Sequence, residues 1–257
     1  MQVTKAVHFI AALLLIGASP VYGMDSDLTN LFRNKGINGT IVISIMDGTK
    51  KYIHDDERAN SRMVPASTFK IPNTLIALEE KAVADEKEII KWDGVDKGMA
   101  VWNKDQSIQT AFPSSCVWFY QALAKRVGIG KYEPYLRKMK YGNEQVGPEV
   151  TTFWLEGDLK ISAVEQIDFL KKVYAREYSF RPSSYEILKK LMIIEETPVY
   201  TLRAKTGWAQ KVGWFVGYVE SANDTWFFAM NMDMAKIEDA PLRKEITIAA
   251  LKLKGII

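Results

Sequence analysis

The chain has 257 residues, of which 47% are hydrophobic and 25% charged, and its formal net charge is +3. This length fits one large domain or two closely packed lobes, and the composition is that of an ordinary globular protein. Lysines are scattered among glutamates and aspartates, so the charge pattern gives no reason to expect a nucleic-acid partner.

The first 23 residues have the pattern of a secretory signal peptide. Lys5 gives a positive start, residues 9–17 form a short apolar run, and residues 21–23 precede an expected cleavage point before Met24. We predict export to the bacterial periplasm or to the outside of the cell, with 24–257 as the mature domain; an uncleaved anchor is the alternative. Cleavage removes one lysine and no acid, which leaves 33 basic and 31 acidic residues, a net charge of +2. No later stretch is long enough to cross a bilayer, so no stable membrane span is expected.

Cysteine and histidine are too rare for several kinds of site. Cys116 is the one cysteine, so an exported chain has no internal disulfide, and His54 is the one histidine after Met24. A His-rich zinc site is therefore unavailable, and a Ser-His-Asp triad would have to use His54, which lies in a polar run typical of a loop or strand edge. No Gly-x-Ser-x-Gly, phosphate-loop or dinucleotide motif is present. We predict neither a metal nor an organic cofactor.

The elements at the amino-terminal end alternate between helix and strand. After a short helix at 27–32, a β-rich run at 39–46 ends at Asp47-Gly48, and 51–53 continues it as a hairpin. A helix beginning near Ala66 has a strongly apolar face that must be buried.

The middle of the chain is predicted to be helical. Residues 85–112 are read as loops and short helices, and Gly128 ends the helix that follows them. Ser162 and Glu165 have the spacing of a capping box at the start of another helix. The predicted helices of this region are 116–127, 159–174 and 183–194, with a turn at 141–143.

The last quarter is rich in aromatic and β-branched residues. It predicts three successive strands, at 200–205, 213–220 and 225–232, and a closing helix at 240–253. Strands at both ends of the chain predict an α+β fold, in which one central antiparallel sheet is flanked by helices and carries an inserted all-helical lobe. We place the sheet lobe at about 24–60 plus 195–257 and the helical lobe at about 61–194.

Ser67 and Lys70 are a candidate nucleophile and base. Residues three apart lie on one face of a helix, so the two side chains can form a hydrogen bond. An adjacent base activates a serine hydroxyl, and burial beside Phe69 lowers a lysine pKa until the amine can accept a proton. Pro72, inside the expected helix, is predicted to strain the turn. The alternative is that Ser67 only caps the helix and Lys70 is a solvated surface residue.

Two further motifs extend this pair. Ser115-Cys116-Val117 begins 48 residues after Ser67, and Lys205-Thr206-Gly207, on a predicted strand, begins 90 residues after Ser115. The order Ser-x-x-Lys, Ser-x-x, Lys-Thr-Gly is the signature of the penicillin-recognising serine enzymes.

The individual residues in and around these motifs resemble those of the class D (oxacillinase-type) serine β-lactamases. This resemblance covers essentially the whole mature chain. Val117 stands where class A enzymes have asparagine, and Tyr141-Gly142-Asn143, Phe153–Gly157 and Pro241-Leu242-Arg243 resemble segments of class D enzymes. The resemblance implies a β-lactamase/transpeptidase-like fold and a small-molecule β-lactam as the substrate. It leads to no prediction for the oligomeric state.

The resemblance also implies a mechanism. Ser67 would attack the lactam carbonyl and hold an acyl group. Lys70 would react with carbon dioxide to give an N-carboxylysine, the general base for acylation and for the hydrolytic water. The pocket of this modified lysine would be formed by Phe69, Val117, Trp154 and Leu155, with the indole N–H of Trp154 as a donor.

The remaining roles follow from the same resemblance. Backbone N–H groups of Ser67 and Trp208 would form the oxyanion hole. Ser115 would pass a proton to the leaving nitrogen with electrostatic support from Lys205. The substrate and its carboxylate would be bound by Thr206, Gly207 and Arg243.

One segment departs from many class D enzymes, and two other functions stay open. The connection at 209–212 is short, which leaves carbapenem hydrolysis open. A β-lactam sensor domain would share the motifs but keep the acyl group, and a cell-wall peptidase or transpeptidase would act on D-Ala-D-Ala peptides. Sensor domains usually follow membrane spans, and Val117 and Trp154 favour a hydrolase over a transpeptidase.

Overall fold

The computed structural model describes residues 25–257, so the signal peptide predicted at 1–23 lies outside the described residues. The helices are α1 (Ser26–Asn34), α2 (Asp56–Asn60), α3 (Lys70–Glu79), α4 (Ile108–Ala111), α5 (Val117–Val127), α6 (Ile129–Met139), α7 (Ala163–Tyr174), α8 (Pro182–Leu191) and α9 (Ala240–Leu253). Three 3-10 turns are η1 (Ala66–Phe69), η2 (Ala100–Trp102) and η3 (Ile237–Asp239). The strands are β1 (Gly39–Ile45), β2 (Lys51–His54), β3 (Ile193–Glu196), β4 (Tyr200–Ala209), β5 (Val212–Ser221) and β6 (Thr225–Asp233).

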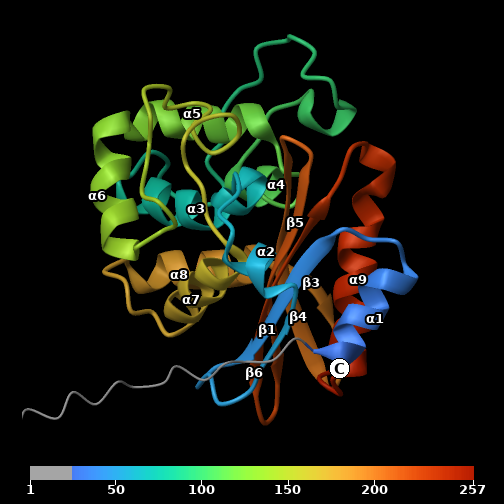
Figure 1. Ribbon diagram of the computed structural model, residues 1–257. Helices are drawn as coiled ribbons and strands as arrows, with labels where there is room; N and C mark the ends of the chain where they lie inside the picture. Colours follow the sequence, from blue (N-terminus) through green and yellow to red (C-terminus); the bar gives the residue numbers. More distant parts are fainter. Residues whose placement is uncertain (1–24) are drawn as a thin grey trace, which may run out of the picture.

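One antiparallel sheet unites the two ends of the chain. Its strand order is β2-β1-β6-β5-β4-β3, so β1 lies beside β6 although the two strands are far apart in the sequence (Figure 1). Every neighbouring pair is antiparallel. The sequence prediction of a sheet built from both ends, with helices between them, is confirmed.

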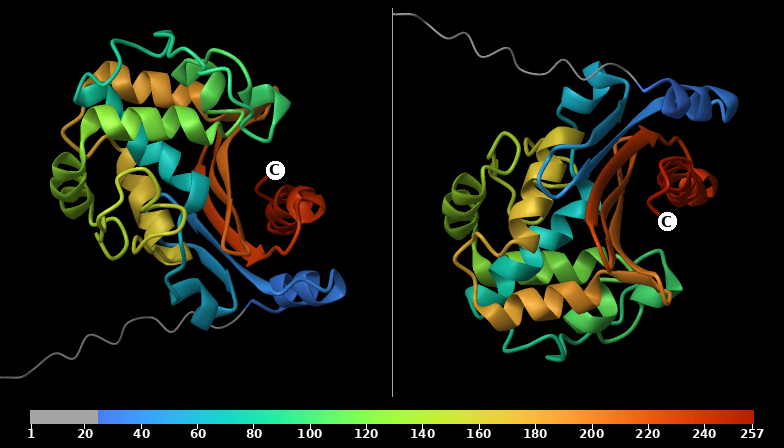
Figure 2. Two further views of the ribbon diagram at one scale, coloured as in Figure 1. Left: turned by 90° about the horizontal axis from the view of Figure 1, so that it is seen from above. Right: turned by 90° about the horizontal axis from the view of Figure 1, so that it is seen from below.

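Helices cover both faces of this sheet (Figure 2). On one face α1 and α9 pack over a cluster that includes Phe32, Phe228 and Leu251. On the other face lies the larger cluster of the helical part, and α3 runs through it with every residue from Lys70 to Leu78 buried. A helix that is buried on all sides places its first turn deep inside the molecule. This burial sets the surroundings of Lys70.

Elements that differ from the sequence prediction include α6 and β3. Residues 129–139 form α6 despite Pro134, because Tyr132, Leu136 and Met139 are buried in the helical cluster and tertiary packing outweighs the weak propensity. The helix predicted at 183–194 ends at Leu191, and residues 193–196 form the edge strand β3 instead, paired with β4. The β-branched Ile193 and Ile194 suit a strand better than a helix end.

Candidate active site

The turn that carries Ser67 is held in a strained conformation. Ala66, the residue before it, has φ of +50°, a left-handed value that costs a non-glycine residue about 1–2 kcal/mol. The Ala66 N–H donates to the carbonyl of Trp154 at 2.9 Å, and Thr68 Oγ1 donates to the Pro65 carbonyl at 2.6 Å. These bonds hold the turn in place. Strain of this kind is typical of functional sites.

Ser67 and Lys70 are in direct contact, as the sequence predicts. Lys70 Nζ donates to Ser67 Oγ at 3.0 Å, and Lys70 is only 1% exposed. Burial lowers the pKa of Lys70 from its usual value to about 7, so the neutral amine is available near neutral pH. The prediction about Pro72 is wrong: α3 begins at Lys70, so Pro72 lies in its first turn, where a missing N–H leaves little unsatisfied.

Aromatic rings surround Lys70. The ring of Phe69 stacks on Trp154 at a centroid distance of 5.6 Å, and the Tyr120 ring lies 4.9 Å from Lys70 Nζ. Trp154 is fully buried. Cys116 is buried beside the lysine. The amine of Lys70 thus lies in a mainly apolar environment.

Ser115 and Lys205 form a second serine–lysine pair in the same site. Lys205 Nζ donates to Ser115 Oγ at 2.5 Å, although 90 positions separate the two residues. Ser115 has φ of +56°, just before α5. Burial holds the pKa of Lys205 well below its usual value, and the nearby charges of Lys70 and Arg243 lower it further.

Strand β4 forms one side of the site. A Cβ at Gly207 would lie 3.1 Å from the Pro65 carbonyl and 3.2 Å from the Thr68 nitrogen. Strand β4 therefore packs tightly against the turn that carries Ser67. Arg243 reaches across from α9, and its Nη1 donates to the Gly207 carbonyl at 2.6 Å. Burial lowers the pKa of Arg243 to about 10, at which it is still charged at pH 7. Trp208 follows and is 39% exposed.

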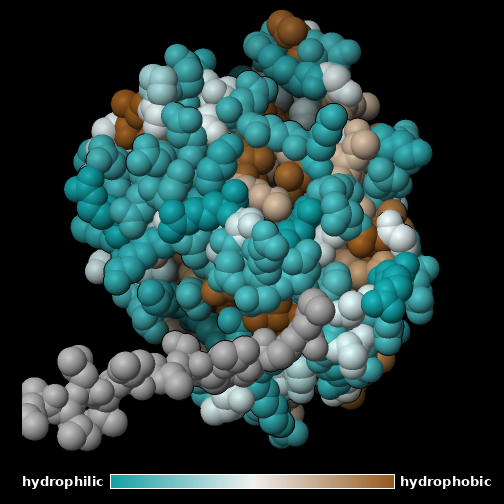
Figure 3. All heavy atoms as spheres, in the orientation of Figure 1, coloured by the Kyte–Doolittle hydropathy of each residue, from teal (hydrophilic) through white to brown (hydrophobic). Residues whose placement is uncertain are grey.

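The other predicted residues lie at the margin of this arrangement. Val117 is the first residue of α5, Leu155 packs against the helical cluster, Thr206 lies on β4, and all three are half-buried. Gln210 Nε2 donates to the Leu155 carbonyl at 3.2 Å, which joins the β4–β5 hairpin to this segment. Figure 3 shows hydrophobic side chains gathered in a hollow between the helical part and the end of this hairpin.

The connection predicted to be short is a two-residue turn. Ala209 pairs with Val212, and Gln210 and Lys211 between them have φ of +48° and +63°. Two positive values are those of a type I′ hairpin turn.

Two residues that the sequence prediction missed also support the site. Tyr120 faces Lys70 from α5, four positions after Cys116 on the same helix face, and this spacing was the available signal. Gln166 is buried on α7, and its Nε2 donates to Thr68 Oγ1 at 3.0 Å. This bond ties α7 to the turn that carries Ser67. No local pattern marks Gln166, because the contact spans 98 positions.

The arrangement is suited to acyl transfer. A buried hydroxyl is paired with an amine that can accept a proton, and a second hydroxyl–amine pair lies beside it. In the described part of the chain, no three His, Cys, Asp or Glu residues are grouped so that they could hold a metal ion. No helix between residues 25 and 257 is long and apolar enough to cross a membrane.

Comparison with known proteins identifies the family. The family model described as the penicillin binding protein transpeptidase domain matches residues 38–252. Beta-lactamase OXA-48 of Klebsiella pneumoniae is 41% identical over 258 residues, covering 98% of this chain and 97% of that protein. Beta-lactamase OXA-2 of Salmonella typhimurium is also 41% identical, over 228 residues that cover 88% of this chain and 83% of that one.

Solved structures agree with these sequence relatives. A class D β-lactamase from Nostoc has a TM-score of 0.87 and 40% identity, covering 90% of this chain and 99% of that chain. FUS-1 (OXA-85), a class D β-lactamase from Fusobacterium nucleatum, has a TM-score of 0.88 and 35% identity, covering 91% of this chain and 100% of that chain. The chain therefore belongs to the class D serine β-lactamases, within the family of the penicillin binding protein transpeptidase domain.

Proposed function

We propose that this enzyme hydrolyses the β-lactam amide of penicillins through an acyl-enzyme on Ser67, with Lys70, in N-carboxylated form, as the general base. The observation that carries the proposal is the buried contact of 3.0 Å between Lys70 Nζ and Ser67 Oγ. A lysine with a pKa of about 7 is half neutral at pH 7, whereas an exposed lysine is almost fully charged.

Acylation uses the two serine–lysine pairs in turn. Ser67 Oγ bonds to the lactam carbonyl carbon while its proton passes to the base at Lys70. The carbon–nitrogen bond of the lactam then breaks, and Ser115 donates a proton to the leaving nitrogen. Lys205, hydrogen-bonded to Ser115, supports that transfer and returns a proton to the hydroxyl.

The negative oxygen formed in this step needs donors that are already in position. We assign that role to the backbone N–H groups of Ser67 and Trp208, because the close approach of β4 to the nucleophile turn places the two segments side by side. The substrate carboxylate is assigned to Thr206, Gly207 and Arg243, with the charged guanidinium as the main attraction.

The surroundings of Lys70 fit a carbamate. Its formation requires a neutral amine, which burial supplies. We assign the indole N–H of the buried Trp154 as a donor for the new oxygens. Phe69, Val117 and Leu155 complete the apolar surroundings. With carbon dioxide bound, the group would supply a carboxylate base for the hydrolytic water. Trp154 then holds that base in position.

Substitution of the base tests this proposal. Lys70→Ala is expected to reduce penicilloate formation by at least about a hundredfold, because general base catalysis typically contributes that much. The matched control is Lys87→Ala, which removes an exposed lysine and is expected to leave turnover unchanged. A Lys70→Ala enzyme that turns over penicillin at the original rate would refute the role of Lys70.

We also propose that residues 1–23 direct export and that 24–257 acts outside the cytoplasm, as one domain with a sheet lobe and a helical lobe. The support is the signal-peptide pattern of the sequence. Expression of the full chain in a bacterium is expected to give a periplasmic protein that begins at Met24, as measured by intact mass. A cytoplasmic protein that retains residues 1–23 would contradict export.

A further inference from the structure

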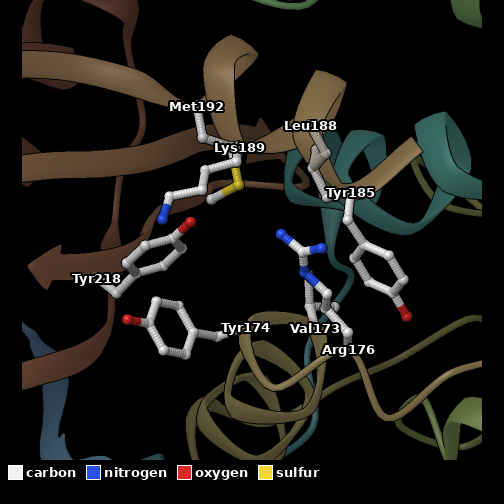
Figure 4. Close-up of a pocket in the computed structure, with 8 residues that line it drawn as sticks. All are labelled: Val173, Tyr174, Arg176, Tyr185, Leu188, Lys189, Met192 and Tyr218. Carbon is white, nitrogen blue, oxygen red and sulfur yellow. The ribbon is translucent and has the colours of Figure 1, made fainter. Parts of the chain in front are cut away.

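A second cavity lies between the helical part and the sheet, and none of its lining residues belongs to the candidate active site. Its volume is about 230 Å³. The cavity is lined by Val173, Tyr174 and Arg176 at the end of α7, Tyr185, Leu188 and Lys189 of α8, Met192, and Tyr218 of β5 (Figure 4).

Tyr218 places an unpaired hydroxyl in this cavity. The residue is only 4% exposed, and no described residue forms a hydrogen bond with its hydroxyl. Figure 4 shows that the hydroxyl points into the cavity, toward the amine of Lys189. A ligand oxygen in the cavity can therefore accept a hydrogen bond from this hydroxyl.

The cationic side chains of Lys189 and Arg176 also line this cavity. Separating each of them from its carboxylate partner costs little free energy. Lys189 Nζ lies 2.7 Å from Glu220 Oε1, but Glu220 also pairs with Arg203, so the carboxylate keeps a partner if Lys189 turns to a ligand. Arg176 pairs with Glu186, and both side chains of that pair are about half exposed, at 47% and 51%. Exposed ion pairs contribute little stability.

Part of the cavity wall is apolar. Leu188 and Met192 line it together with the rings of Tyr174 and Tyr218, which meet edge to face at 5.3 Å. A volume of about 230 Å³ is below that of a site for a drug-sized ligand and suits a single ring with a short polar group.

We propose that this cavity binds a small aromatic carboxylate. The ring lies against the apolar part of the wall, and the carboxylate accepts hydrogen bonds from Tyr218 and Lys189, with Arg176 as the second cation. This proposal is independent of the function proposed for Ser67.

A fluorine NMR titration with 4-fluorobenzoate tests the proposal. We expect saturable binding of one molecule per chain, with a dissociation constant on the order of 1 mM for a ligand of this size. Tyr218→Phe removes only the hydroxyl and should weaken binding about fivefold. Lys189→Gln removes the charge and should weaken it about tenfold or more.

Two matched variants serve as controls. Tyr174→Phe removes a hydroxyl of the same cavity that Figure 4 shows pointing away and that bonds to Thr225. Lys190→Gln removes an exposed charge from the same helix. Both should bind the probe unchanged. No saturable binding, or binding that Tyr218→Phe and Lys189→Gln leave unchanged, would overturn the proposal, the latter because the carboxylate would then bind elsewhere.

Discussion

The surroundings of the two lysines in the site change their pKa values. Lys70 and Lys205 are both buried in the same site. Burial lowers the pKa of both, and the charge of Lys70 lowers that of Lys205 further. The amine of Lys70 can therefore be neutral near pH 7, and Lys205 gives up its proton more readily than an exposed lysine does.

The activity is expected to depend on pH through Lys70. Above a pKa of about 7 the amine is neutral and can form the carbamate; below it the amine is an ammonium that cannot react with carbon dioxide. We therefore expect kcat/KM for benzylpenicillin to fall about tenfold for each unit below pH 6, because kcat/KM reports the free enzyme. A profile measured in excess bicarbonate that stays flat down to pH 5 would contradict this assignment.

The indole N–H of Trp154 is expected to matter most for deacylation. Trp154→Phe keeps a ring against Phe69 but removes the donor, so release of the acyl group should slow by about tenfold or more, with a smaller effect on its formation. The two rates are separated by stopped-flow and single-turnover measurements.

The matched control for this variant is Trp214→Phe. It also removes a buried indole N–H, which donates to the Val64 carbonyl at 2.9 Å, and it should leave the ratio of the two rates unchanged. Equal slowing of both steps in Trp154→Phe would argue against its proposed role.

At the scale of elements, the site depends on where β4 meets the turn η1. The turn is strained at Ala66, and β4 approaches it so closely at Gly207 that a Cβ there would lie 3.1 Å from the Pro65 carbonyl. The β4–β5 hairpin ends in a turn whose two central residues are not glycine, although both have positive φ. Both features lead to predictions about glycine.

Gly207→Ala is expected to disturb catalysis strongly. The added Cβ would lie 3.1 Å from the Pro65 carbonyl, so β4 or the turn that carries Ser67 must shift by a few tenths of an ångström. Small displacements at a reacting centre can cost about a hundredfold in rate. The readout is kcat/KM for benzylpenicillin. Gly130→Ala is the control, since no atom lies within 4 Å of its Cβ position, and its activity should be unchanged. Full activity in Gly207→Ala would contradict this close approach.

Lys211→Gly is expected to stabilise the protein. Glycine adopts φ of +63° without the cost that lysine carries, so the free energy of unfolding in urea should rise by about 1 kcal/mol. Lys211→Ala has the same backbone cost as lysine and should show no such gain. A Lys211→Gly protein no more stable than Lys211→Ala would show that the turn is not strained.

At the scale of the whole molecule, the chain order of elements was predictable, and contacts between distant segments were not. Hydrophobic periodicity and turn residues predict the strands near both ends and most of the helices between them. The hydrogen bond between Ser67 and Lys70 follows from their spacing on one helix face, whereas that of Gln166 to Thr68 depends on tertiary packing. The same holds for α6, which packing stabilises despite Pro134.

The contact between Ser115 and Lys205 was predictable from the motifs and not from the local sequence pattern. Nothing local predicts that these side chains meet across 90 positions, and only the three-motif pattern placed them together. The positive φ values of Ala66 and Ser115 could not be predicted from the sequence, because neither residue type favours a positive φ.

The most direct test of the whole account is intact-mass analysis of the mature enzyme mixed with excess benzylpenicillin in bicarbonate, sampled from seconds to hours. We predict a short-lived adduct of one penicillin per chain, absent in Ser67→Ala, and penicilloate that accumulates far beyond the enzyme concentration. An adduct that persists for hours at one per chain, without further product, would contradict the proposed hydrolysis and identify a β-lactam sensor or penicillin-binding protein.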